Sequence, residues 1–284
     1  MAIKIELSVV EDIIREVGAE EIMPRFRKLK QGDIEMKGIN DPVTIADKEA
    51  EQHLTERFKD YLPGSVVVGE ESYAKDHGIM SHISGEHPVW IIDPIDGTRN
   101  FVSGMPEFAV MVALVQRRQS LASWIHDPNS GDTIMAEKGS GVWLRGHKLR
   151  LAGNEAPIGL VGARVKKLIS NPTVMPAGVQ VAKVEIGSCA GFDYPRLFMG
   201  DAVFAKATSN RASFAIYRHS NPWDHAPGLF MHQEAGGYSA DWFGCPYDMD
   251  QPHKGLLLAP DKKTWETLHQ MFNPLIQHVL TKSV

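Results

Sequence analysis

Cysteine is scarce in this chain: only Cys189 and Cys245 occur among 284 residues. Two cysteines are too few for a disulfide framework and are typical of a protein kept in a reducing compartment. No stretch approaches the ~20 apolar residues that a membrane-spanning helix needs. The first residues alternate charged with apolar side chains, which is unlike a signal peptide. We therefore expect a cytoplasmic protein that does not bind membranes.

Positive charge is also in short supply. Lys and Arg number 30 against 35 Asp and Glu, which gives a formal net charge of −5. Bulk electrostatics therefore do not favour nucleic acid as a partner, and the pair Lys166 and Lys167 is too short for a basic patch. The 12 histidines invite a zinc site, but His225 and His232 lack a Cys or His cluster at ligand spacing.

The pattern of expected helices and strands predicts a layered α/β protein. Apolar residues make up 43% of the chain, which permits a substantial core. Helices are expected at residues 5–18, 20–29, 47–61, 224–235 and from 262 until Pro274. Strands are expected at residues 66–68, 90–92, 108–115, 121–126, 133–136, 141–144, 159–163, 202–205 and 256–259. Loop-like composition at residues 153–157 divides the chain into a first half, 1–152, and a second half, 153–284.

Acidic residues gather where one predicted strand ends. Residues 93–98 follow an apolar run and include Asp93 and Asp96. Carboxylate oxygens are ligands that Mg²⁺ prefers, and Mg²⁺ commonly binds protein and substrate phosphate together. Pro94 fixes one backbone angle between the two acids, and Gly97 lets the backbone approach a ligand closely. The segment therefore predicts a metal and phosphate site.

Three other segments carry acids at comparable places. Glu70 and Glu71 follow another strand-like run, and Asp47 lies in the first turn of a predicted helix, where the helix dipole favours an acid. Asp224 occupies the expected N-cap of a helix that Gly236 would end. One acidic pair in a turn commonly does no more than cap or solvate, so the combination carries the prediction.

The order and content of these segments resemble the inositol monophosphatase family. The matching segments are Gly69-Glu70-Glu71-Ser72, Trp90 to Thr98 with Asn100-Phe101, and Trp223-Asp224 with Ala226 and Gly228. The resemblance extends from the Asp47 helix to Gly237. It implies a five-layer αβαβα sandwich, shared with fructose-1,6-bisphosphatase, with metal ions at the seam between the halves. It also implies Mg²⁺-dependent, lithium-sensitive hydrolysis of phosphomonoesters.

The same resemblance assigns the metal ligands. Two or three Mg²⁺ ions are the implied cofactors. Glu70, Asp93 and the backbone carbonyl of Ile95 would hold the first ion. Asp93, Asp96 and Asp224 would hold the second, so that Asp93 bridges the two, and a third ion would rest on Glu70 and water.

Catalytic roles follow from the resemblance too. Thr98 and Asp47 would orient and deprotonate the attacking water, with Glu70 as the third catalytic residue. Asp96 and the amides of Gly97 and Thr98 would bind the substrate, although Thr98 has the alternative of simply capping a helix.

Two residues beside the acids have open roles. Glu71 would orient a ligand or a water, the alternative being an inert surface acid. Lys37 lies in residues 36–42, which resemble a mobile loop of the family that carries a lysine near the third ion. An ordinary solvated lysine is the alternative for Lys37.

The substrate side departs from the family pattern. Gly187, Ser188 and Cys189 resemble the family loop whose backbone meets the substrate. Members that favour inositol phosphates carry a glutamate seven positions before the aspartate of the Trp-Asp motif, but here that position is Tyr217. Arg218 follows and would either bind a second phosphate or carboxylate or remain a surface cation.

The leading hypothesis is a phosphomonoesterase acting on a small polyol or sugar phosphate such as inositol 1-phosphate. The alternatives are a histidinol-phosphatase, a 3′-phosphonucleotide phosphatase and a fructose-1,6-bisphosphatase. A catalytically silent metal-binding regulator is the alternative from another class, and the complete set of acids disfavours it. We also expect a homodimer.

Overall fold

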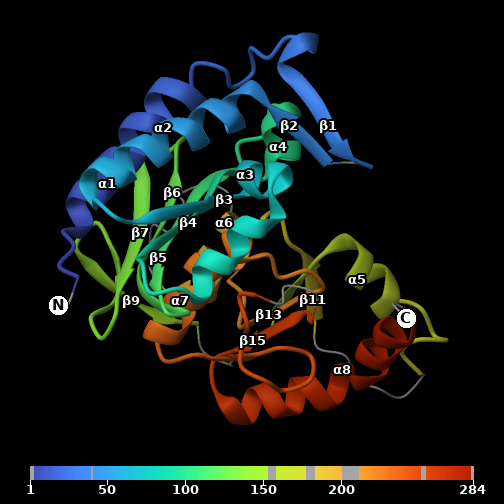
Figure 1. Cartoon of the computed structure of the whole chain (residues 1–284). Coiled ribbons are helices and arrows are strands. Elements are labelled where there is room, and N and C mark those ends of the chain that lie inside the picture. Colours follow the sequence, from blue (N-terminus) through green and yellow to red (C-terminus); the bar gives the residue numbers. More distant parts are fainter. Residues whose placement is uncertain are drawn as a thin grey trace.

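Helices and sheets alternate through five layers of the molecule (Figure 1). The structure is a computed structural model that describes residues 3–39, 41–152, 158–176, 183–199, 211–250 and 254–282. The order of layers is helix, sheet, helix, sheet, helix, which confirms the expected αβαβα sandwich. The strand predicted at residues 202–205 lies outside the described residues.

The first sheet has eight strands in the order β12-β9-β8-β7-β6-β5-β4-β3. In this order the strands are Phe198–Met199, His147–Leu151, Gly141–Leu144, Asp132–Glu137, Gln119–Asp127, Ala109–Gln116, Val89–Asp96 and Val66–Gly69. Only β3 and β4 pair in parallel, and their register sets Gly69 opposite Ile92. Because both strands point the same way, the next residues, Glu70 and Asp93, are neighbours.

Two helices, α1 (Leu7–Val17) and α2 (Ile45–Tyr61), cover the outer face of this sheet (Figure 1). Their apolar stripes meet sheet residues such as Trp90, whose ring stacks on Phe58 with centroids 4.4 Å apart. α2 begins where it does because Thr44 and Asp47 form a reciprocal capping box. This cap also fixes Asp47 at the end of the helix nearest to the acidic segments.

The middle layer consists of α6 (Ala190–Asp193) and α7 (Pro222–Glu234), which lie between the two sheets. Gly228 of α7 makes room for the ring of Tyr194, because a Cβ there would lie 2.1 Å from the ring. Tyr194 is completely buried, and its hydroxyl lies 3.1 Å from His225 Nδ1. α7 is thereby held with its first turn facing the acidic segments of the first sheet.

The second sheet has five strands in the order β11-β10-β13-β15-β14. In this order they are Lys183–Ile186, Ile158–Val161, Phe214–Tyr217, Leu256–Ala259 and Tyr238–Ala240. β10 pairs in parallel with both β11 and β13, so these three strands end at the same edge of the sheet. Its outer face is covered by α5 (Ala163–Ile169) and α8 (Lys262–Lys282).

The remaining elements lie near the acidic segments or connect layers. β1 (Ile34–Gly38) and β2 (Asp41–Thr44) form a hairpin beside α4 (Thr98–Val102), and α3 (Glu70–Lys75) follows β3 (Figure 1). The short turns of helix are η1 (Gly18–Ile22), η2 (Gln31–Asp33), η3 (His77–Ser84) and η4 (Tyr194–Leu197).

The prediction of a helix at residues 20–29 is wrong. Instead, α1 continues into one wide turn at Gly18–Ile22, and turns follow. Pro24 has no backbone N–H to continue the helix, and Arg27 adopts a left-handed φ of 59°. These two residues end the helical path that the apolar periodicity suggested.

Two predicted helix ends also differ. α8 continues through Pro274, because Phe272 and Leu275 on either side are completely buried against the second sheet. Packing there outweighs the hydrogen bond that proline removes. α7 begins at Pro222, where a missing N–H costs nothing, so Asp224 lies inside the first turn and is not the N-cap.

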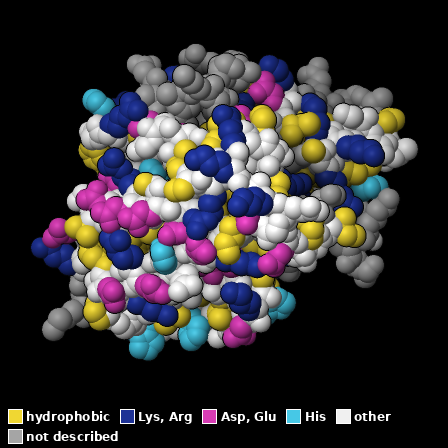
Figure 2. Space-filling view, turned by 90° about the horizontal axis from the view of Figure 1, so that it is seen from above, with side chains coloured by type: hydrophobic (Ala, Val, Ile, Leu, Met, Phe, Trp, Pro, Cys, Tyr) yellow, Lys and Arg dark blue, Asp and Glu magenta, His cyan; other side chains and the backbone are white. Residues whose placement is uncertain are grey.

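The surface shows mixed charge. Seen from above, Lys and Arg side chains lie among Asp and Glu side chains with scattered hydrophobic groups (Figure 2). This face therefore carries no extended field of one sign. Within the described ranges, the structure has no helix long and apolar enough to cross a membrane.

The Gly228 contact predicts a stability change. Gly228→Ala is expected to destabilise the protein by about 1–3 kcal/mol, because the added methyl group must displace the buried Tyr194 ring. Alanine's better helix propensity, about 1 kcal/mol, offsets only part of this loss. Urea unfolding measures the change. Gly32→Ala is the control, since a Cβ at Gly32 meets nothing within 4 Å; equal stability of the two variants would contradict the prediction.

Candidate metal centre and active site

Three carboxylates from distant parts of the chain meet at one point. Glu70 follows β3, Asp93 lies in β4, and Asp224 lies in the first turn of α7. One oxygen from each lies within 4.8 Å of the others. The parallel pairing of β3 with β4 accounts for the first two, and the middle-layer position of α7 brings the third.

The charges at this point are poorly compensated. Burial raises the pKa of Asp93 well above its usual value, and repulsion from Glu70, Asp96 and Asp224 adds to the effect. Burial also raises the pKa of Asp224, with Asp96 and Glu70 contributing. Asp93 is only 2% exposed, so water cannot relieve this repulsion. A set of oxygen donors with excess negative charge fits a hard divalent cation such as Mg²⁺.

Asp96 and Ile95 adjoin this group. Burial raises the pKa of Asp96 to about 6, while the Gly191 N–H that its carboxylate accepts works against the rise. The Ile95 N–H donates to Asp93 Oδ1 at 3.0 Å, and the Ile95 carbonyl oxygen lies 3.0 Å from the Thr98 hydroxyl oxygen. Asp96 is close enough to affect Asp224 but is not among the three acids that share the 4.8 Å point.

Asp47 and Thr98 form a hydrogen-bonded pair at the edge of the acidic group. The Thr98 hydroxyl donates to Asp47 Oδ1 at 3.1 Å, and Asp47 Oδ2 accepts from the Thr44 N–H at 2.7 Å. Burial raises the pKa of Asp47 to about 6, although hydrogen bonds from Thr44 and Thr98 favour its charged form. At pH 7 and above, Asp47 is thus an anion able to accept a proton from Thr98.

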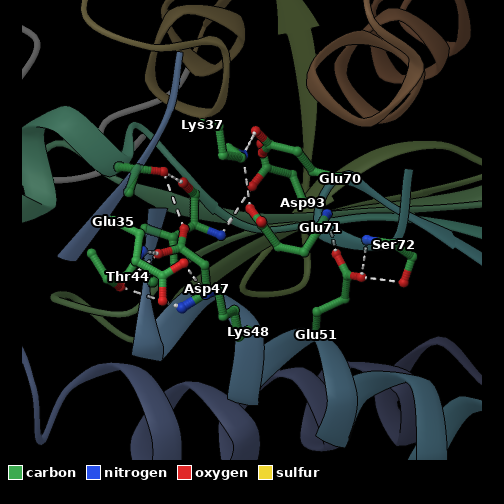
Figure 3. Close-up of polar contacts among 12 residues, drawn as sticks. Glu35, Lys37, Thr44, Asp47, Lys48, Glu51, Glu70, Glu71, Ser72 and Asp93 are labelled. Carbon is green, nitrogen blue, oxygen red and sulfur yellow. Dashed lines mark hydrogen bonds and ion pairs between the residues drawn. The ribbon is translucent and has the colours of Figure 1, made fainter. Parts of the chain in front are cut away.

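Lys37 reaches the site from the β1–β2 hairpin (Figure 3). Its ammonium lies 2.6 Å from Glu70 Oε1 and 2.9 Å from Glu71 Oε1. Burial opposes its charge, but attraction to the two glutamates raises the pKa of Lys37 above its usual value. Burial likewise raises the pKa of Glu70 to about 7, with Lys37 opposing the rise. Lys37 and Glu71 therefore lie beside Glu70, and the roles expected for them stay predictions.

The loop at Gly187, Ser188 and Cys189 lies against the turn that begins α4. A Cβ on Gly97 would lie 3.1 Å from Cys189 Sγ, and the φ of Gly97 is 91°. Asn100 Nδ2 donates to Ser188 Oγ at 2.9 Å, which ties the loop to α4. The two predicted substrate-side segments are therefore adjacent, although they lie about ninety positions apart in the sequence.

Tyr217 ends β13 and packs inward. Its ring lies 4.6 Å from the ring of His225 and 6.0 Å from that of Tyr194. Among the described residues its buried hydroxyl has no hydrogen-bond partner of normal geometry. Burial raises the pKa of the nearby Asp193 to about 7, and the Tyr217 hydroxyl opposes part of this rise. Arg218, which follows, is partly buried.

Sequence reasoning missed two buried acids around the site. Glu51 of α2 accepts hydrogen bonds from Glu71 and Ser72, and Asp193 of α6 accepts the Ser188 N–H at 3.0 Å. Glu51 lies four positions after Asp47, so the helical spacing put both on one face of α2 and was an available signal. No local pattern marked Asp193, because its partner loop approaches it only in the folded chain.

Comparison with known proteins agrees with this geometry. The profile of the inositol monophosphatase family matches residues 6–279. A fructose-1,6-bisphosphatase/inositol-1-monophosphatase of Thermotoga maritima is 32% identical over 213 residues, covering 73% of this chain and 74% of that protein. A histidinol-phosphatase of Chlorobaculum parvum is 32% identical over 207 residues, covering 72% and 73%.

A solved structure gives the same result. An IMPase from Thermotoga maritima superposes with a TM-score of 0.75 at 26% identity, covering 96% of this chain and 98% of that one. The match to the family profile, over residues 6–279, includes both sheets and every acidic segment described above. The chain belongs to the inositol monophosphatase family, whose members are phosphoric monoester hydrolases.

Proposed function

We propose that this chain hydrolyses the phosphate monoester of a small polyol or sugar with Mg²⁺ as its cofactor. The observation that carries the proposal is the convergence of Glu70, Asp93 and Asp224 within 4.8 Å. Asp96 and the Ile95 carbonyl would complete the ligands. Bound Mg²⁺ ions would neutralise phosphate charge and lower the pKa of a water molecule. A homodimer and inhibition by lithium are further expectations.

Thr98 and Asp47 supply the proton path. In this proposal the attacking water gives a proton to the Thr98 oxygen while the Thr98 hydroxyl passes its own to Asp47 Oδ1, 3.1 Å away. Burial of Asp47 raises its pKa to about 6, which makes it a better proton acceptor than an exposed aspartate. The capping box with Thr44 prevents Asp47 from turning away.

The turn at Gly97 would receive the phosphate. Its left-handed backbone presents the amides of Gly97 and Thr98 next to Asp96, and such amides can bind phosphate oxygens. The reaction needs little covalent help from the protein, because phosphoryl transfer depends mainly on positioning and neutralisation of charge. Loop residues Gly187 and Ser188, adjacent to this turn, would contact the leaving alcohol.

The leaving alcohol is the open part of the proposal. Relatives of this chain are named both fructose-1,6-bisphosphatase/inositol-1-monophosphatase and histidinol-phosphatase. Tyr217 stands at the position that is glutamate in inositol-preferring relatives, and its ring lies in the core beside His225. We therefore infer that the loop backbone and Arg218, and not a carboxylate, read the leaving group.

A phosphate-release panel tests the function. With Mg²⁺, the protein is expected to release phosphate from at least one of inositol 1-phosphate, fructose 1,6-bisphosphate, histidinol phosphate and 3′-phosphoadenosine 5′-phosphate. Chelation should stop the release, and fresh Mg²⁺ should restore it. Absence of release from every ester would overturn the proposal. Preference for a substrate with a second anionic group, reduced by Arg218→Gln, would support the role given to Arg218.

Asp93 is the ligand that the proposal places between two ions. Asp93→Asn should abolish phosphate release at saturating Mg²⁺. The same change should not lower the Tm of the metal-free protein, because burial and the neighbouring acids already disfavour the charged form of Asp93, and the neutral amide has nearly the same shape. Asp60→Asn, on the exposed side of the last turn of α2, is the matched control. Normal turnover by Asp93→Asn would show that the bridging role is wrong.

The pH dependence of metal binding follows from the raised pKa values. Asp96 and Glu70 have pKa values of about 6 and 7, above their ordinary 3.8 and 4.5. Their protonation therefore stabilises the metal-free fold in acid, and this contribution is lost as the pH rises through 6 to 7. Cations must displace these protons. As the pH is lowered below these pKa values, the apparent Mg²⁺ affinity should therefore fall about tenfold per pH unit for each proton displaced. The Mg²⁺-induced rise in Tm should be larger at pH 8 than at pH 6; an equal rise would contradict this.

A further inference from the structure

Glu51 is a buried acid that the proposed reaction does not use. It lies on α2, one helical turn after Asp47, and is 4% exposed. Burial raises the pKa of Glu51 above its usual value. A carboxylate at this depth is costly unless it is well hydrogen-bonded, so its partners indicate why it is there.

The partners of Glu51 are the first backbone groups of α3. Glu51 Oε2 accepts the Glu71 N–H at 2.7 Å, and Oε1 accepts the Ser72 N–H at 2.7 Å together with the Ser72 hydroxyl (Figure 3). The first N–H groups of a helix have no partner within it and are commonly satisfied by the side chain of the N-cap residue. The N-cap of α3 is Gly69, which has no side chain. Glu51 therefore caps α3 from a different helix.

Gly69 and Glu51 fit each other. A Cβ on Gly69 would lie 2.3 Å from the Glu51 carboxyl, far inside contact distance. The φ of Gly69 is −107°, which any residue can adopt. Backbone conformation thus does not require glycine at this position, whereas the approach of the Glu51 carboxylate does.

This arrangement connects α2 to both sides of the acidic site. Asp47 holds the Thr98 turn through the Thr98 hydroxyl, and Glu51, one turn further along the same helix face, holds the turn that carries Glu70. α2 is itself packed on the first sheet through Ala50 and Leu54, both completely buried. The helix therefore sets the separation between the proton acceptor and a metal ligand.

We propose that Glu51 is a positioning residue that fixes the direction of Glu70 and so determines the affinity of the site for Mg²⁺. This inference rests on the metal-dependent function proposed above. Groups that orient metal ligands typically change affinity 10- to 100-fold when mutated. A purely structural role for Glu51 would lower the stability of the fold without changing Mg²⁺ affinity in the folded protein.

The first experiment is calorimetric titration of the full chain with MgCl₂ at pH 8. Glu51→Gln replaces one accepting carboxylate oxygen with an NH₂ group, which cannot accept, so its Kd for Mg²⁺ should be about tenfold or more above that of the wild type. Glu56→Gln is the matched control, because Glu56 lies on the exposed face of the same helix and accepts a hydrogen bond from Gln52 at 3.0 Å, away from α3. An unchanged Kd in Glu51→Gln would overturn the proposal.

A double-mutant cycle separates an effect on the position of Glu70 from a general loss of folding. Gly69→Ala should weaken Mg²⁺ binding as Glu51→Gln does, because its methyl group displaces the carboxylate. In a Glu51→Ala background the clash is gone, so Gly69→Ala should add little to the loss. Additive losses would refute the coupling even if one single variant folds poorly. Wild-type protein that neither binds Mg²⁺ nor releases phosphate would instead refute the proposed function.

Discussion

The parallel pairing of β3 with β4 is the constraint on which the acidic site depends. The other pairs in the eight-stranded sheet are antiparallel, and antiparallel neighbours end at opposite edges. The parallel register sets Gly69 opposite Ile92, so Glu70, the first residue after β3, lies beside Asp93, which is still within β4. A shift of one residue in this register would turn one carboxylate to the other face of the sheet. All eight residues of β4 are buried, which makes such a shift costly.

Concentrating acids at this edge creates a charge problem that the protein resolves only in part. The acids that face backbone donors are satisfied by hydrogen bonds: Thr44 for Asp47, the α3 amides for Glu51, and Gly191 for Asp96. Glu70 has Lys37 as its counter-ion. Asp93 accepts the Ile95 N–H and shares a hydrogen bond with Asp224, but it remains surrounded by other carboxylates. Hydrogen bonds therefore compensate the periphery of the site, and the residual negative charge lies at its centre, where a cation is most favourable.

Parts of the site that depend on residues close together in the sequence could be predicted, and parts that depend on contacts between distant segments could not. The acids were recognisable because each lies in a short segment whose own chemistry marks a strand end or a helix start. The pattern of helices and strands predicted a layered α/β protein, and the family resemblance supplied its five layers. The capping box of Thr44 and Asp47 is equally local. Glu51 is different, since its role depends on α2 passing beneath the turn after β3, and a single sequence does not show that contact. Pro274 was misjudged for a similar reason: buried neighbours in tertiary contact keep α8 helical through it.

The substrate side is organised on another principle, which explains why chemistry was easier to infer than specificity. Gly187 lies directly on the carboxylate of Asp193, where a Cβ would be 2.0 Å from Oδ2, and Asp193 also accepts the Ser188 N–H. These contacts fix where the loop lies without fixing which alcohol it meets, because they use backbone groups on the inner side of the loop. The acids, by contrast, would contact only the cations and the phosphate group, and the phosphate group is common to every phosphomonoester. Changes at Tyr217 or along the loop can therefore alter which leaving group the site accepts without disturbing the acidic centre. For this reason the motifs that identify the reaction carry little information about its substrate.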